Sequence, residues 1–95
     1  MMGNVLTVLK VIPTSPEVNR ESLIEKIGKE MAPDGLEVLK TEEQPLYYGL
    51  FSIFFYLKHP DSDEGSEMLN NLQAGMQDLD VIESVEVEAQ TLMQA

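Results

Sequence analysis

Few side chains in this chain could carry out covalent chemistry. The only histidine, His59, stands before Pro60 in a polar stretch, and the serines of the same stretch are Ser62 and Ser66. No glycine-framed turn of the kind that presents a nucleophilic serine surrounds them, and the chain has no cysteine. We therefore expect His59 to be a solvated surface residue and not a catalytic base.

Acidic side chains are dense in the same stretch, where Asp61, Asp63 and Glu64 precede Gly65 and Glu67 follows. Carboxylate oxygens at this density could hold Ca²⁺ or Mg²⁺ weakly. The spacing departs from an EF-hand loop, which would need its glycine one position later. A solvated acidic loop leading into a helix is the favoured interpretation, and a divalent-metal site is the alternative.

Phosphate-binding signatures are absent from the sequence. There is neither a Walker loop nor a G-x-G-x-x-G pattern. The only arginine, Arg20, falls in the first turn of a predicted helix, whereas small enzymes of the acylphosphatase kind need an arginine in a phosphate-cradling loop. We expect a protein that holds no cofactor and is not an enzyme.

The charge is strongly acidic and unevenly distributed. The chain has 17 acidic residues against 6 basic ones, a net charge of −11, and residues 59–95 contain no lysine or arginine. This argues against direct nucleic-acid binding and against anionic membranes, and it favours a basic protein partner or serves solubility alone. No secretory signal or membrane-length apolar run is present, so we expect a cytoplasmic protein.

Periodicity predicts six elements in one domain that covers residues 1–95. These are strands over 5–12, 36–41, 50–58 and 81–91, a helix capped by Asn19, and a second helix capped by Ser66. The order β-α-β-β-α-β predicts an α+β, ferredoxin-like sandwich: a four-stranded antiparallel sheet with both helices on one face. The first and third strands should be central, and the open face should carry Phe or Tyr. In the last strand, Val85, Val87 and Ala89 should form a dry face.

Two large rings stand beside a turn in Tyr47-Tyr48-Gly49, directly after Pro45 and an acidic stretch that we expect to be part of the turn. Adjacent residues of a strand face opposite sides, so one ring should enter the core and the other should project. A projecting tyrosine suits a protein interface, because it buries a large rigid area and keeps a polar tip. The alternative is that both rings lie flat along the sheet edges.

Four segments in order resemble the guanine-nucleotide exchange domain of the translation elongation factor 1-beta family, in its short archaeal form. They are Lys10-Val11-Ile12-Pro13 with Ser15-Pro16 and Val18-Asn19; Glu42-Glu43-Gln44-Pro45-Leu46-Tyr47-Tyr48-Gly49-Leu50; Gly65-Ser66-Glu67-Met68-Leu69; and Glu83-Ser84-Val85-Glu86-Val87. The second is similar to the family's Pro-x-aromatic-x-Gly-hydrophobic turn. Together they cover nearly the whole chain.

The resemblance implies a ferredoxin-like fold and a non-enzymatic exchange factor that speeds GDP release from the GTPase elongation factor 1-alpha. It also implies that Pro45, Tyr47, Tyr48 and Gly49 form the turn whose aromatic residue enters a pocket on the GTPase. That residue is Tyr48, or Tyr47 if the register differs by one. The rival hypothesis is a ferredoxin-like ligand-sensing or interaction module that dimerises through its open sheet face.

One departure from the family concerns the C-terminus, where relatives place a basic residue beside the Mg²⁺ site of the GTPase. Residues 88–95 carry no positive charge. Three explanations stay open: the tail, including Leu92 and Gln94, acts sterically; Lys10 or Lys58 supplies the charge; or exchange is weak.

Overall fold

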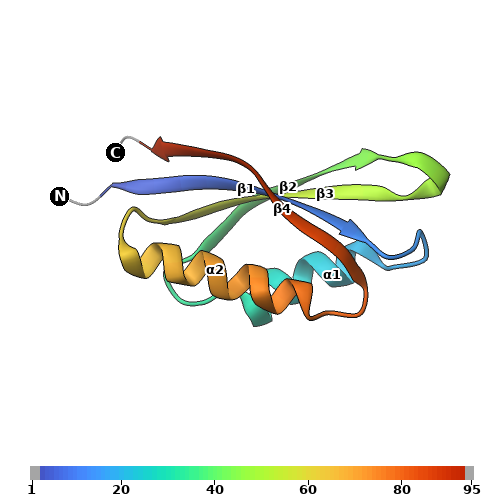
Figure 1. Cartoon of the computed structure of the whole chain (residues 1–95), viewed down its shortest axis with the longest axis horizontal. Coiled ribbons are helices and arrows are strands. Elements are labelled where there is room, and N and C mark those ends of the chain that lie inside the picture. Colours follow the sequence, from blue (N-terminus) through green and yellow to red (C-terminus); the bar gives the residue numbers. More distant parts are fainter. Residues whose placement is uncertain (1–2, 94–95) are drawn as a thin grey trace.

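Four strands and two helices follow one another as β-α-β-β-α-β in this computed structural model, which describes residues 3–93 (Figure 1). Their bounds are β1 (Asn4–Pro13), α1 (Arg20–Lys26), β2 (Glu37–Pro45), β3 (Phe51–Pro60), α2 (Asp63–Gln77) and β4 (Ile82–Met93). A π-helical turn, Ile27–Met31, continues α1, and a 3₁₀ turn, Tyr47–Gly49, joins β2 to β3.

The strands form one antiparallel sheet in the order β2-β3-β1-β4. Figure 1 shows both helices on the same side of this sheet, which leaves the other side open. The predicted ferredoxin-like sandwich is therefore confirmed, with the apolar strands β1 and β3 at the centre and the more polar β2 at an edge.

The core fills the space between the sheet and the helices. Alternate residues of the central strands face it, and both helices supply apolar side chains at helical spacing. Its most deeply buried members are Leu9, Val11, Ile27, Ile53, Phe55, Leu57, Leu72 and Met76. Asn19 caps α1 as predicted, since its Oδ1 accepts a hydrogen bond from the Ser22 N–H at 3.0 Å.

The start of α2 differs from the prediction. Ser62, not Ser66, is the N-cap, and its hydroxyl oxygen accepts a hydrogen bond from the Gly65 N–H at 3.2 Å. Asp63 and Glu64 then lie in the first turn, where the helix dipole favours negative charge. The acidic stretch predicted to be a loop is therefore mostly helix.

His59 is buried, with 3% of its surface exposed, so the prediction of a solvated histidine is wrong. Strand β3 continues through it, and its side chain lies on the helix-facing side two residues after Leu57. Nε2 lies 2.8 Å from Thr7 Oγ1, and Nδ1 lies 3.2 Å from the Pro60 carbonyl oxygen. Gln90 Nε2 also donates to Thr7 Oγ1, at 3.1 Å, so polar contacts link β3, β1 and β4.

Strand β4 keeps only part of its predicted dry face. Val85 is buried, but Val87 is 44% exposed. A shift in register places Val87 opposite Leu9 and Ala89 opposite Val8, which lie on opposite sides of β1. Because this bulge interrupts the two-residue alternation, Val87 and Ala89 do not share one face.

Candidate functional site

The predicted aromatic turn lies at the tip of a long hairpin formed by β2 and β3, which Figure 1 shows reaching past the start of α1. The segment 42–45, which we predicted to be part of the turn, belongs to β2 instead. Pro45 ends that strand opposite Phe51. This position is tolerated because β2 is an edge strand and proline there removes no hydrogen bond from a central ladder.

The turn itself has an unusual backbone. Tyr48 has φ 62° and ψ 31°, and Gly49 has φ 79°, so two successive residues are left-handed. The loop is closed by hydrogen bonds from Leu46 N to Leu50 O at 2.7 Å and from Leu50 N to Tyr47 O at 3.2 Å. A left-handed conformation costs a bulky L-residue free energy, and such residues cluster at functional sites.

Both tyrosine rings project into solvent, with Tyr47 84% exposed and Tyr48 94% exposed. The prediction that one ring enters the core is wrong, and so is the alternative that both lie flat against the sheet edges. The reason is local: the two residues lie in a left-handed turn and not in a pleated strand, so the alternation of faces does not apply to them.

The turn rests on the loop that connects β1 to α1. A β-carbon placed on Gly49 would lie 3.6 Å from Pro16 Cβ, which is ordinary van der Waals contact. The positive φ is what favours glycine at position 49, because a β-carbon 3.6 Å from Pro16 would fit there. The turn pattern of the sequence indicated Gly49, and Ser15-Pro16 was part of the family-like pattern, but the sequence did not show that Gly49 and Pro16 lie side by side.

Leu92, one of the two C-terminal residues predicted to contact the partner, lies far from this turn. Leu92 is 61% exposed and pairs with Val5 at the start of β1, whereas Ile53, which follows the turn, pairs with Val11 near the end of β1. The Cα trace extends 46 Å along its longest axis, and Figure 1 shows the hairpin tip and the end of β4 towards opposite ends of it. Gln94 lies outside the described residues.

The two lysines named as substitutes for a basic tail are also separated. Lys10 pairs with Phe54 and Glu86, towards the hairpin end of the sheet. Lys58 pairs with Leu6, which on its other side pairs with Thr91, so Lys58 lies at the same end as the tail.

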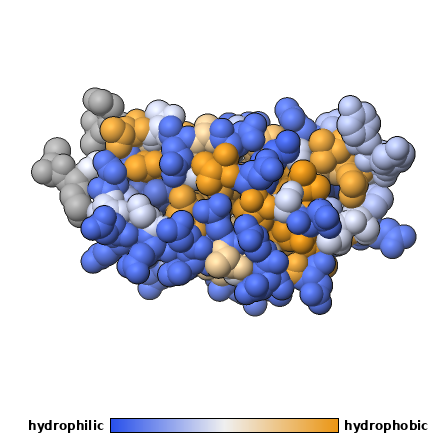
Figure 2. All heavy atoms as spheres, viewed as in Figure 1, coloured by the Kyte–Doolittle hydropathy of each residue, from blue (hydrophilic) through white to orange (hydrophobic). Residues whose placement is uncertain are grey.

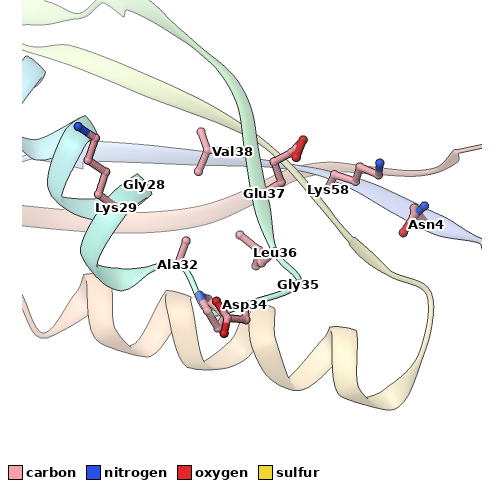
Figure 3. Close-up of a pocket in the computed structure, with 11 residues that line it drawn as sticks. Asn4, Gly28, Lys29, Ala32, Asp34, Gly35, Leu36, Glu37, Val38 and Lys58 are labelled. Atoms are coloured by element: carbon pink, nitrogen blue, oxygen red, sulfur yellow. The ribbon is translucent and has the colours of Figure 1, made fainter.

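A hollow of about 660 Å³ lies between the π-helical turn and the start of β2 (Figure 3). Its charged lining residues are Lys29 and Lys58 against Asp34 and Glu37, so the wall carries both signs equally. Lys58 is the one residue considered above that lines it; the residues of the aromatic turn and Leu92 do not. Among residues 3–93, no group of three or more His, Asp or Glu side chains is arranged to hold a metal ion, and no helix is long and apolar enough to cross a membrane.

The open sheet face carries Phe54 and Tyr56, as predicted, but charged groups of the same hairpin cover Tyr56. Lys40 Nζ lies 4.5 Å from the centre of the Tyr56 ring and 2.9 Å from Glu42 Oε1, and the Tyr56 hydroxyl donates to Glu42 at 3.3 Å. The hydrogen bond between Lys40 and Glu42, and then their mutual attraction, raise the pKa of Lys40 and lower the pKa of Glu42. Dimerisation through this face stays a prediction.

In the space-filling view the surface of the helical layer, at the bottom, is mainly hydrophilic (Figure 2). A ferredoxin-like sandwich that raises two exposed rings on a left-handed turn is an interaction domain. Residues 6–93 match the model of the EF-1 guanine nucleotide exchange domain, and the chain belongs to that family. Its function is that of a guanine-nucleotide exchange factor in translation elongation.

Individual relatives agree with the family match. Elongation factor 1-beta of Methanocaldococcus jannaschii is 34% identical over 90% of this chain and 97% of its own length. The protein of the same name from Thermococcus gammatolerans is 39% identical over 90% of each chain. That of Sulfurisphaera tokodaii is 39% identical over 76% of this chain and 84% of its own length.

Proposed function

We propose that the chain, as a single exchange domain over residues 1–95, releases GDP from the GTPase elongation factor 1-alpha by inserting the Tyr48 ring into that partner. The observation that carries the proposal is the Tyr48 ring, 94% exposed on a backbone with φ 62°. An exposed ring contributes nothing to the core, so the conformational cost of its left-handed backbone has no return in folding stability.

The energetic logic is that of coupled binding. An exchange factor stabilises the nucleotide-free GTPase. Binding of the exchange factor lowers the affinity of the GTPase for nucleotide, and binding of nucleotide lowers its affinity for the exchange factor by the same factor. Release of GDP by this route requires no covalent step from the exchange factor, so we propose that the chain is not itself an enzyme. Its place of action is then the compartment of translation, the cytoplasm.

The C-terminal end supports a second contact with the GTPase. Because Leu92 lies at the opposite end of the sheet from Tyr48, the two must touch separate regions of the partner. Leu92 and Gln94 act sterically in this proposal. Lys58, at the same end as Leu92, is better placed than Lys10 to supply a positive charge there.

The test is release of a fluorescent GDP analogue from elongation factor 1-alpha, with and without this protein. Tyr48→Ala should reduce stimulated release roughly 30-fold, since an interface hot spot contributes on the order of 2 kcal/mol or more. Tyr47→Ala is the matched control, because its ring is also exposed but its backbone is not left-handed. If the wild-type protein leaves the release rate unchanged, the proposal fails; if Tyr47→Ala has the larger effect, the inserted ring is Tyr47.

A further inference from the structure

Arg20, the only arginine of the chain, is the first residue of α1 and contacts the hairpin that carries the aromatic turn. Its guanidinium carbon lies 3.9 Å from the centre of the Phe51 ring, and its Nε forms an ion pair with Glu43 Oε1. An arginine suits this place because a planar guanidinium can stack on a ring and pair with a carboxylate at once.

The two partners of Arg20 come from the two strands of the hairpin, on either side of the turn. Glu43 lies in β2, two residues before Pro45, and Phe51 is the first residue of β3. Pro45 and Phe51 are paired in the sheet. One side chain from the helical layer therefore contacts both strands of the hairpin close to its turn.

The hairpin tip needs such an attachment, because a two-stranded ribbon twists more freely than a wider sheet. Strand β2 is an edge strand and is largely exposed along its length. Beyond the ribbon's own pairing, the contacts near its tip include Arg20 stacked on Phe51 and Pro16 beside Gly49. A rotation of the ribbon at its base would move the Tyr48 ring, because that ring is at the tip of the ribbon.

We propose that Arg20 is a positioning residue for nucleotide exchange: it fixes the angle of the hairpin relative to the helical layer and so aims the Tyr48 ring at the partner. This inference rests on the proposed role of Tyr48. It predicts that Arg20 acts only through that ring and touches neither the GTPase nor the nucleotide.

A double-mutant cycle tests this dependence with the same GDP-release assay. Arg20→Ala should slow stimulated release about tenfold, because a small misplacement of a positioned group is enough to lose this much rate. In the Tyr48→Ala background, Arg20→Ala should change the rate less than twofold. Arg20→Lys keeps the charge but not the planar stacking, so it should fall between Arg20→Ala and wild type.

The chain offers a matched control in Lys40, which also stacks a cation over a ring and pairs with a glutamate of the hairpin. Both partners of Lys40, Tyr56 and Glu42, belong to the hairpin itself, so Lys40→Ala removes the same kinds of contact without freeing the hairpin from the helical layer. Stimulated release should be unchanged in Lys40→Ala.

The outcomes separate the two proposals. If Tyr48→Ala is inactive and Arg20→Ala equals wild type, Arg20 is not a positioning residue and the role of Tyr48 stands. Independent, multiplying effects of Arg20→Ala and Tyr48→Ala would also overturn the positioning role, since Arg20 would then act without the ring. If Tyr48→Ala itself is fully active, the proposed function fails first. Where Arg20→Ala does not fold, Arg20→Lys and Glu43→Gln carry the same cycle.

Discussion

Replacing Tyr48 by asparagine should make the protein more stable and at the same time inactive in exchange. With 94% of the residue exposed, the ring buries only roughly 10 Å² of a side chain that could bury about 200 Å². At about 25 cal/mol per Å², the lost burial amounts to roughly 0.3 kcal/mol. Asparagine tolerates the left-handed conformation, which costs other L-residues roughly 1–2 kcal/mol.

The net gain in the free energy of unfolding should then be about 0.7–1.7 kcal/mol after the lost burial is subtracted. For a domain of this size, that gain raises the melting temperature by roughly 3–14 °C. Thermal unfolding followed by circular dichroism measures the stability, and release of a fluorescent GDP analogue measures the activity. Tyr47→Asn is the control, since Tyr47 has no left-handed backbone and gains no such relief.

Two results would refute this reasoning. A melting temperature several degrees below wild type would mean that the Tyr48 ring packs against the protein in solution. A more stable variant with wild-type exchange would mean that the left-handed turn serves something other than contact with the GTPase.

Three further outcomes follow from the fold. Gly65→Ala should destabilise the protein by roughly 2 kcal/mol or more, measured by urea unfolding, because the new β-carbon would collide with the carbonyl oxygen of the last residue of β3. Ser62→Ala should cost about 1 kcal/mol in the same measurement and Ser66→Ala almost nothing, because only the first hydroxyl caps α2. An NMR titration should find a pKa for the Glu42 carboxyl below that of a free glutamate, and Lys40→Ala should restore it; the small stabilisation from this exposed pair is present above the unfolded-state pKa and is lost as the pH falls through the lowered one.

The fold was predictable because its signals are local and redundant. Each central strand is apolar along most of its length, and α1 has both a capping residue, Asn19, and an apolar stripe that begins at Leu23. Only one arrangement in the sequence order β-α-β-β-α-β buries both kinds of apolar face against each other with short connections. A helix or strand predicted from a pattern that repeats over several residues is still predicted when one residue departs from that pattern.

The boundaries near His59 were not predictable in the same way. Ser62 and Ser66 are both good caps, and acidic residues follow both of them, so the sequence offered two equivalent starts for α2. The proline after His59 suggested the end of the strand, but a proline at the last strand position removes no needed donor. Because the later start was chosen for α2, His59 was predicted to lie in a loop, whereas it is buried in strand β3.

The sequence predicted the wrong backbone geometry for the aromatic turn. The pair Tyr47 and Tyr48 was treated as strand, where faces alternate, because nothing in its side chains favours a positive φ. Gly49 was the one local sign of a left-handed turn, and the residue before it shares that conformation. Arg20 lacked any sign, because its partners Glu43 and Phe51 are far from it in sequence and meet it only in the folded sheet.

The distance between the turn and the tail limits what the absence of a basic residue from residues 88–95 can affect. A cation at the tail could not assist the Tyr48 ring directly, since the two stand at opposite ends of a 46 Å molecule. Two separate contacts on one rigid body multiply in affinity only if the partner presents both sites at matching separation. A neutral tail therefore weakens one contact and leaves the geometry of the other intact. Under the proposed two-contact arrangement, exchange by this chain would then depend more heavily on the hairpin end, where the left-handed turn lies.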